Sequence, residues 1–270
     1  MKELSCEEIK SLQLEILQSV HDFCEENGIR YVLWAGTLLG AVRHNGYIPW
    51  DDDIDIAMPR ADFDKFFQEF HHKRFIAKCI DCDPTFLFTF GKVCDSETEL
   101  IENKLHRTSI GVNIDVFPLD EIPNDNTKRK IFCKRVILNQ KFIEIKQILI
   151  NKNRVFYKNI ILLLGKALLF FVSYKTLNKT HVKLIRKYAG NNEDMICNLA
   201  WGIGEKEAVF KNTVIDRKKH LFESSKFYIP KSYDDVLRRR YGDYLTLPPE
   251  PKRISHHNFK VFHKESGGAI

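Results

Sequence analysis

Four carboxylates within five residues constrain this chain more than any other stretch of its sequence. They belong to Asp51, Asp52, Asp53 and Asp55. An apolar run begins among them at Ile54 and continues to Met58. Like charges this close repel one another, and the repulsion is relieved when a cation lies among them. The cluster therefore predicts a divalent metal site.

Strand alternation would separate the acidic and the apolar side chains of this stretch. If residues 53–58 form a strand, the apolar side chains point to one face and those of Asp53 and Asp55 to the other. Asp51 joins the acidic face if the extended path begins early. Mg²⁺ is the expected occupant, with Mn²⁺ as an alternative, because Mg²⁺ binds carboxylates and completes its shell with water and substrate phosphates. This pattern predicts phosphate chemistry.

Three other interpretations compete for the same aspartates. An EF-hand loop starting at Asp51 needs Gly at its sixth position and Glu at its twelfth, where this chain has Ile56 and Asp62. A nucleotide-sugar glycosyltransferase usually has a substantial alternating domain before its Asp-x-Asp motif, and too little chain precedes this one. A solvated acidic turn would explain a lone acidic pair better than it explains this cluster. The metal site is favoured.

Composition and charge set the broad class. The chain has 270 residues, 44% hydrophobic and 29% charged, which is typical of a globular protein. Its net charge of +6 comes from a Lys/Arg-rich second half, as expected where a protein meets phosphates or an anionic surface. Seven cysteines, with no signal peptide evident at the N-terminus, indicate a cytoplasmic location, with the inner face of the membrane as an alternative. The lone CxxC of Cys79 and Cys82 is expected in a structural turn.

Local patterns predict the elements of the first half. A helix is expected over residues 5–27, opened by the capping-box pair Ser5 and Glu8, and a strand over 31–34. The small residues Gly36 and Thr37 then open a short helix whose backbone amides could approach a phosphate. A helix over 61–70 and strands over 86–93 and 111–117 follow. The last strand repeats the acidic design, with Asp115 on the face opposite to its apolar side chains.

The second half reads as helices over 126–189, followed by mixed structure with a helix over 232–241. The apolar run 160–172 is shorter than the roughly 20 residues of a spanning helix. A buried helix is favoured there over a membrane-surface helix held by basic flanks. Beyond the rigid segment 247–251 come Lys252, Arg253, His256 and His257, which fit either a phosphate clamp or proton acceptor, or a solvated loop.

The predicted fold class is α/β in the broad sense, specifically α+β, with a mixed sheet. We expect a catalytic core over 1–125, a helical region over 126–190 and a C-terminal part over 191–270 that completes the site. The order of elements resembles the polymerase-beta type of nucleotidyltransferase, in which a Gly-Ser/Thr turn precedes paired acids and a third acid lies on a neighbouring strand. The matching acids here are Asp53, Asp55 and Asp115.

A narrower resemblance rests on longer motifs. Residues 36–44, 46, 48–56 and 58–59, which read GTLLGAVRH, G, IPWDDDIDI and MP, closely resemble the LicD family, related to fukutin and fukutin-related protein. The tail residues 241–244, 248–249, 252–253 and 256–257 are similar to the C-terminal signature of that family. Fukutin-related proteins also carry a zinc-binding insertion, for which this chain lacks the cysteine spacing.

The resemblance implies transfer of an alcohol phosphate, typically phosphocholine, from a CDP-alcohol to a sugar hydroxyl of a cell-surface glycan, with CMP leaving. The partners it implies are CDP-choline or a related donor and a glycan or lipid-linked glycan acceptor, with peripheral membrane contact as an option and no nucleic acid. It implies metal ligation by Asp53, Asp55 and Asp115, with Asp51 as an extra ligand. In this scheme Asp115 is either a further metal ligand or the base that takes the acceptor proton.

Other residues are candidates for donor contacts. The candidates for phosphate binding are of two kinds. Gly36 and Thr37 would act through the turn, and Arg43 and Lys92 through their positive charge. Trp34 and Trp50 could stack on cytosine or enclose a choline ammonium, although packing is the commoner role of such residues. Two alternatives remain open: transfer of a nucleoside monophosphate from an NTP with release of pyrophosphate, and a non-catalytic scaffold for glycan assembly.

Overall fold

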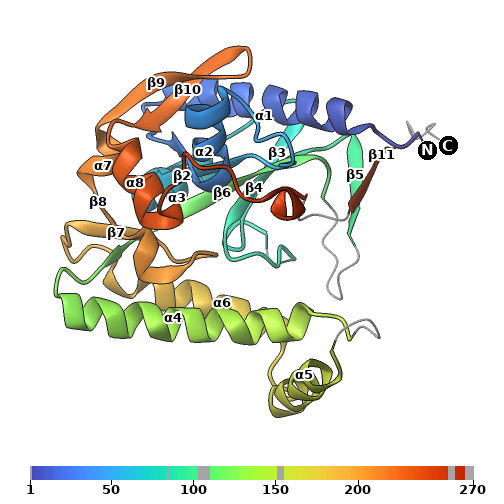
Figure 1. The fold of residues 1–270 in the computed structure, drawn as a ribbon, viewed down its shortest axis with the longest axis vertical. Helices are drawn as coiled ribbons and strands as arrows, with labels where there is room; N and C mark the ends of the chain where they lie inside the picture. The colour runs from blue at the N-terminus through green and yellow to red at the C-terminus, as the bar shows by residue number, and fades with distance from the viewer. Residues whose placement is uncertain (1, 84, 103–109, 151–154, 255–258, 265–270) are drawn as a thin grey trace.

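A mixed sheet with helices around it forms the centre of the molecule (Figure 1). The computed structural model describes residues 2–83, 85–102, 110–150, 155–254 and 259–264. Its helices are α1 (Cys6–Glu26), α2 (Ala35–His44), α3 (Arg60–Glu69), α4 (Asn126–Gln147), α5 (Phe156–Leu168), α6 (Tyr174–Ile185), α7 (Asn212–Ile215) and α8 (Tyr233–Tyr241). Its strands are β1 (Val32–Leu33), β2 (Asp55–Pro59), β3 (Phe75–Lys78), β4 (Gly91–Asp95), β5 (Thr98–Glu102), β6 (Asn113–Ile122), β7 (Met195–Asn198), β8 (Val209–Phe210), β9 (Arg217–Phe222), β10 (Ser225–Pro230) and β11 (Phe259–His263).

Strand β6 organises the main sheet. The strand order is β1-β2-β6-β4-β3, and β7 pairs with the last residues of β6 and with β8. The β2–β6 pair is parallel and the other pairs are antiparallel. The sheet is therefore mixed, and the predicted α+β class is confirmed.

The apolar alternation of β2 and β6 anchors the core. Ile56, Ile114 and Val116 are completely buried, as is Ile54 just before β2. Helices α1 and α3 pack against these strands, and their apolar side chains belong to the same core cluster. Burial of this face fixes the register, because a slip of one residue would send the opposite set of side chains into the core.

Two smaller sheets complete the fold. The hairpin of β9 and β10 runs beside α1 at one side of the molecule (Figure 1). Strand β11 returns from the C-terminal part to pair with β5, and a bridge joins Glu3 to Phe262. The segment before α1 and strand β11 consequently lie side by side.

Several predicted elements are confirmed and several boundaries are wrong. Helix α1 has the expected capping box at Ser5 and Glu8, and Cys79 and Cys82 lie in a tight turn. The strand expected over 86–93 begins only at Gly91. Residues 86–88 have no regular structure and 89–90 form a bend, and the rings of Phe86, Phe88 and Phe90 pack in series with centroids 5.2 and 5.4 Å apart. The acidic strand begins at Asp55 rather than at residue 53.

The prediction of a buried helix in the run 160–172 is wrong. Helix α5 ends at Leu168, and Leu162 is its one buried residue. Phe170 and Phe171, which follow it, are exposed. Within the described part of the chain, no helix combines the length and the apolar character needed to cross a bilayer.

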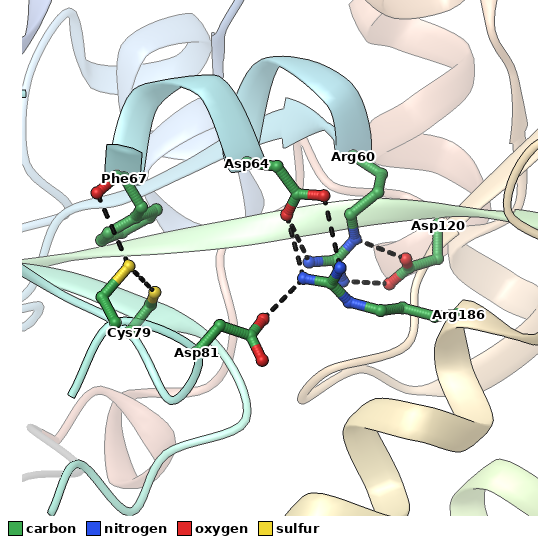
Figure 2. A network of polar contacts seen from close by, with 8 residues as sticks. Arg60, Asp64, Phe67, Cys79, Asp81, Asp120 and Arg186 are labelled. Carbon is green, nitrogen blue, oxygen red and sulfur yellow. Dashed lines mark hydrogen bonds and ion pairs between the residues drawn. The ribbon is translucent and has the colours of Figure 1, made fainter. Parts of the chain in front are cut away.

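An ion-pair network joins α3 to the far end of β6 and to the segment after α6 (Figure 2). Arg60 donates two hydrogen bonds of 2.7 Å to the carboxylate of Asp120, whose side chain is 1% exposed. Arg186 donates to Asp64 at 2.9 Å and to Asp81 at 2.6 Å. Because the Arg60 and Asp120 charges are buried against each other, loss of Asp120 leaves Arg60 with only its longer, 3.4 Å pair with Asp64.

We expect Asp120→Ala to lower the free energy of unfolding by about 3 kcal/mol, since the buried Arg60 guanidinium loses two short hydrogen bonds and keeps only the longer pair with Asp64. Urea unfolding followed by circular dichroism measures the change. The matched control is Glu69→Ala, which breaks an exposed 3.9 Å pair with Lys65 on the same helix and should cost less than about 1 kcal/mol. An equal loss in the two variants would contradict the role assigned to this network.

Candidate active site

Three charged side chains lie in one row across the main sheet. The parallel register places Asp55 of β2 opposite Asp115 of β6, and the antiparallel register places Asp115 opposite Lys92 of β4. Residues directly opposite each other share a face, so the row lies on the side away from the buried apolar residues. Lys92 forms an ion pair with Asp115 and donates to Asn113 Oδ1 at 2.9 Å.

The row faces a cavity of about 240 Å³. Its charged lining residues are Asp53, Asp55, Lys92, Asp115 and Arg240. The uncharged lining residues include Ala35, Phe88, Gln147, Tyr174, Asn178 and Trp201. The walls therefore come from the sheet, from α4 and α6, and from α8, although these segments are far apart in the sequence.

The segment that enters β2 holds a second acidic group. Carboxylate oxygens of Asp51, Asp52 and Asp53 lie within 4.8 Å of one another. Asp53 belongs to this group and also lines the cavity with Asp55 and Asp115. The structure thus brings the four predicted acids into one continuous region and adds Asp52, which the strand-alternation argument left out.

Gln13 of α1 holds this acidic segment in place. Its Nε2 donates to the carbonyl of Asp52 at 3.0 Å, and its Oε1 accepts from the Tyr47 hydroxyl at 2.9 Å. Gln13 is only 4% exposed, so both contacts are shielded from water. A glutamine on the buried face of a periodic helix was the one sequence signal for this role.

Gly36 and Thr37 support the acids at the start of α2. A Cβ on residue 36 would lie 2.7 Å from Asp51 Oδ2, so only glycine lets that carboxylate approach the helix. The hydroxyl of Thr37 accepts a 2.8 Å hydrogen bond from the Asp55 N–H. Ala35, just before them, has a φ of 46°, in the left-handed region. Strain of this kind is often found at functional sites.

The electrostatics of Asp55 are unfavourable without a partner. Burial raises the pKa of Asp55 well above its usual range, and the charges of Asp53, Asp115 and Asp51 raise it further. Arg240 opposes this shift in the pKa of Asp55 from the other wall. The donor set consists of carboxylate oxygens, the ligands that Mg²⁺ and Mn²⁺ prefer. These residues fit a hard divalent cation, which would relieve the repulsion.

Some predicted contacts lie elsewhere. The Arg43 guanidinium donates to the carbonyl of Tyr244 at 2.7 Å and to His44 Nε2 at 2.9 Å, and Arg43 does not line the cavity. Trp34 is 1% exposed and packs in the core. The Arg253 guanidinium lies over the ring of Trp50, with its Cζ 5.6 Å from the ring centroid. Trp50 does not line the cavity either.

The tail segment is described only in part. Lys252 ends a short 3-10 turn, Glu250–Lys252, and Arg253 donates to the carbonyl of Pro248 at 2.8 Å. His256 and His257 lie outside the described residues.

Sequence reasoning missed Arg240, Tyr174 and Trp201 as lining residues. Arg240 pairs with Glu207, whose side chain is 1% exposed, and its guanidinium lies at the cavity. It directly precedes the tail motif that begins at Tyr241, and that proximity was the available signal. Nothing in the sequence distinguishes Tyr174 and Trp201 from core aromatics, because their place depends on how the helices fold over the sheet.

Comparison with known proteins agrees with the geometry. Residues 28–149 match the family model described as the LicD/FKTN/FKRP nucleotidyltransferase domain. The chain is 29% identical over 275 residues to the lipopolysaccharide cholinephosphotransferase LicD of Haemophilus influenzae, covering 95% of this chain and 97% of that protein. It is also 30% identical to an uncharacterized protein of Rickettsia typhi over 51% of this chain and 52% of that one.

The matched segment contains the turn, the acidic cluster, Lys92 and the β6 acid, and the match to the Haemophilus protein extends over nearly the whole length of both chains. Residues 28–149 are therefore similar to the LicD/FKTN/FKRP nucleotidyltransferase domain, and nearly the whole chain is similar to the Haemophilus LicD protein.

Proposed function

We propose that this protein is a phosphotransferase that moves phosphocholine from CDP-choline to a sugar hydroxyl of a lipopolysaccharide-type or other cell-surface glycan, releasing CMP. One observation carries the proposal: the in-register row of Asp55, Asp115 and Lys92 faces a cavity that also contains Arg240. Carboxylates for a cation beside fixed positive charges are what a pyrophosphate donor requires. The printed name of the Haemophilus relative supports the choice of phosphocholine and of a glycan acceptor.

The acids would hold the metal. Asp53 and Asp55 are the proposed ligands, with Asp51 as an extra ligand and Asp115 as a further ligand or as the base. Bound Mg²⁺ would supply charge neutralisation at the pyrophosphate. Thr37 contributes by fixing the backbone of Asp55, and Gln13 by fixing that of Asp52.

The remaining groups act on the phosphates. The acceptor hydroxyl oxygen attacks the phosphorus that bears choline, the bond from that phosphorus to the CMP oxygen breaks, and a carboxylate accepts the hydroxyl proton. Lys92 and Arg240 stabilise negative charge as it develops on the departing CMP. Lys92 is held on Asp115 and Asn113 before the donor binds, so little reorganisation is needed.

Aromatic side chains suit the choline group. Phe88, Tyr174 and Trp201 line the same cavity. The faces of aromatic rings attract quaternary ammonium groups, which carry charge but donate no strong hydrogen bond. These three residues replace Trp34 and Trp50 as our proposed choline contacts.

The experiment that tests this proposal is a Mg²⁺-dependent product assay with purified protein and a panel of CDP-alcohols and NTPs. We expect release of CMP from CDP-choline, and we expect EDTA to stop this release. Pyrophosphate released from an NTP would instead support the alternative, transfer of a nucleoside monophosphate. The second candidate rests on the match of residues 28–149 to a nucleotidyltransferase domain. No turnover of any donor with a glycan acceptor present would favour the scaffold alternative.

We expect Asp53→Ala to reduce CMP release by at least about a thousandfold while the protein stays folded, because the apolar face of the strand is untouched. Turnover and circular dichroism are measured together. The matched control is Asp22→Ala, an exposed aspartate on α1, which should keep wild-type turnover. Retained activity in a folded Asp53→Ala protein would contradict the metal assignment.

Asp55→Asn should stabilise the protein at pH 7 in EDTA by about 1–2 kcal/mol, because it removes a half-buried charge that lies among other carboxylates. The raised pKa of Asp55 means that the folded state binds more protons than the unfolded state above the ordinary pKa of aspartate. Wild-type stability therefore falls as pH rises through that window, and the advantage of Asp55→Asn shrinks as pH falls toward about 4.

Urea unfolding between pH 4 and 8 in EDTA measures this difference. Asp115→Asn is the matched control on the neighbouring strand, and it should destabilise the protein because Lys92 loses its ion-pair partner. An Asp55→Asn protein that is less stable than wild type at every pH would contradict the account of Asp55.

A further inference from the structure

Helix α5 and the residues after it expose a large apolar surface. The exposed side chains are Val155, Phe156, Tyr157, Ile160, Ile161, Leu163, Leu164, Leu168, Phe170 and Phe171. We call this set the α5 surface. Phe171 is 95% exposed and Leu168 is 79% exposed. Soluble proteins rarely expose so many contiguous apolar side chains unless another phase or partner covers them.

The helix is attached to the molecule along one narrow side. Leu162 is buried, and Gly165 packs against Ile145 of α4, where an added Cβ would come within 3.2 Å. Lys166 donates to the carbonyl of Lys146 at 3.3 Å. In Figure 1, α5 projects beyond α4, on the side away from the main sheet. The exposed side chains therefore face outward and are not an unfinished part of the core.

The charge around this surface has one sign. From residue 145 to residue 192 the chain has ten Lys or Arg residues and no Asp or Glu. Lys158 on α5 and Lys175, Lys179 and Lys183 on α6 are exposed, and the three on α6 are four residues apart and so share a helix face. Apolar side chains flanked by lysines are typical of helices that lie in the headgroup region of anionic membranes.

We propose that the α5 surface docks the protein on an anionic lipid bilayer, with the apolar side chains at the acyl boundary and the exposed lysines at lipid phosphates. With only 13 residues, α5 lies along the interface and does not cross it. A second copy of the chain is a poor occupant, because two surfaces of the same positive charge would meet. An acidic protein partner is the other occupant that the test addresses.

Docking would also bring one wall of the catalytic cavity close to the membrane. The helices on either side of α5 line that cavity, through Gln147 at the end of α4 and Tyr174 at the start of α6. These two side chains are in contact with each other. A glycan attached to a membrane lipid could thus reach the cavity while α5 rests on the bilayer. The inference goes beyond the proposed transfer and does not depend on the identity of the donor.

The test is flotation of the full chain with vesicles of phosphatidylcholine alone or of phosphatidylcholine and phosphatidylglycerol at about three to one. We expect the protein to float with the anionic vesicles and to bind the neutral ones at least tenfold more weakly. The double variant Leu164→Gln with Phe171→Ser should lose at least tenfold in binding to the anionic vesicles. Lys158→Glu with Lys175→Glu should lose a similar factor.

Phe210→Ser is the matched control, since Phe210 is 60% exposed on β8, outside the α5 surface, and should leave flotation unchanged. All variants alter exposed side chains, so their thermal midpoints should equal that of wild type. CMP release with a soluble acceptor should also be unchanged in Leu164→Gln with Phe171→Ser, which separates failure of docking from failure of the proposed transfer.

Three results would overturn the proposal. The first is absence of flotation with either vesicle. The second is flotation that survives the α5 substitutions. The third is a wild-type dimer in light scattering that the α5 substitutions convert to a monomer. Absence of flotation would leave an acidic protein as the occupant of the α5 surface.

Discussion

The parallel pairing of β2 with β6 is the constraint on which the rest of this structure depends. It places Asp55 directly opposite Asp115, and the next pairing adds Lys92 to the same row. The buried isoleucines and valine on the opposite face fix that register, because a one-residue slip would send carboxylates into the core. The packing that stabilises the sheet therefore also determines where the carboxylates meet.

The arrangement works against stability at the site itself. Burial and neighbouring carboxylates raise the pKa of Asp55, and the positive charges that line the same cavity belong to Lys92 and Arg240. Functional groups are often held in such unfavourable surroundings by a core that stabilises the fold elsewhere. Here that core is the apolar face of the sheet with α1 and α3 packed on it. A cation and a pyrophosphate donor would complete the charge balance in the function we propose.

Helices from the second half of the chain convert this face of the sheet into a cavity. Gln147, Tyr174 and Asn178 approach from α4 and α6, and Arg240 approaches from α8. The same two helices flank α5, so the proposed catalytic site and the proposed membrane surface share a structural support. This gives a physical reason for a basic, apolar helix beside an enzyme that we propose to act on membrane-linked glycans.

Local patterns in the sequence predicted the elements that have local causes. The capping box of α1, the short helix after Gly36 and the two acidic strands follow from residues a few positions apart. The segment 86–90 was misread as a strand, because alternating phenylalanines satisfy a strand pattern while their rings pack on one another. The exposed α5 was misread as buried, since apolar composition does not reveal what covers a helix.

The candidate site shows the same division. Asp53, Asp55, Asp115 and Lys92 were predicted from strand alternation and the family resemblance, and the structure brings them to one cavity. Their roles as ligands, base and phosphate contact stay predictions. Trp201 could not be predicted, and Arg240 had only its place before the tail motif as a signal, because both reach the cavity through the folding of the second half of the chain over the sheet. Arg43 was predicted as a phosphate contact because of its charge. In the structure its guanidinium donates to the carbonyl of Tyr244 and so connects α2 to the segment after α8.

The most direct test of the central claim is a crystal structure with Mn²⁺ and CDP-choline, in which anomalous scattering locates the metal. Our account predicts an anomalous peak at roughly 2.0–2.3 Å from oxygens of Asp53 and Asp55 and in contact with the donor pyrophosphate, which lies beside Lys92. A donor bound in the cavity with no metal at these carboxylates, or a metal bound away from the pyrophosphate, would contradict it.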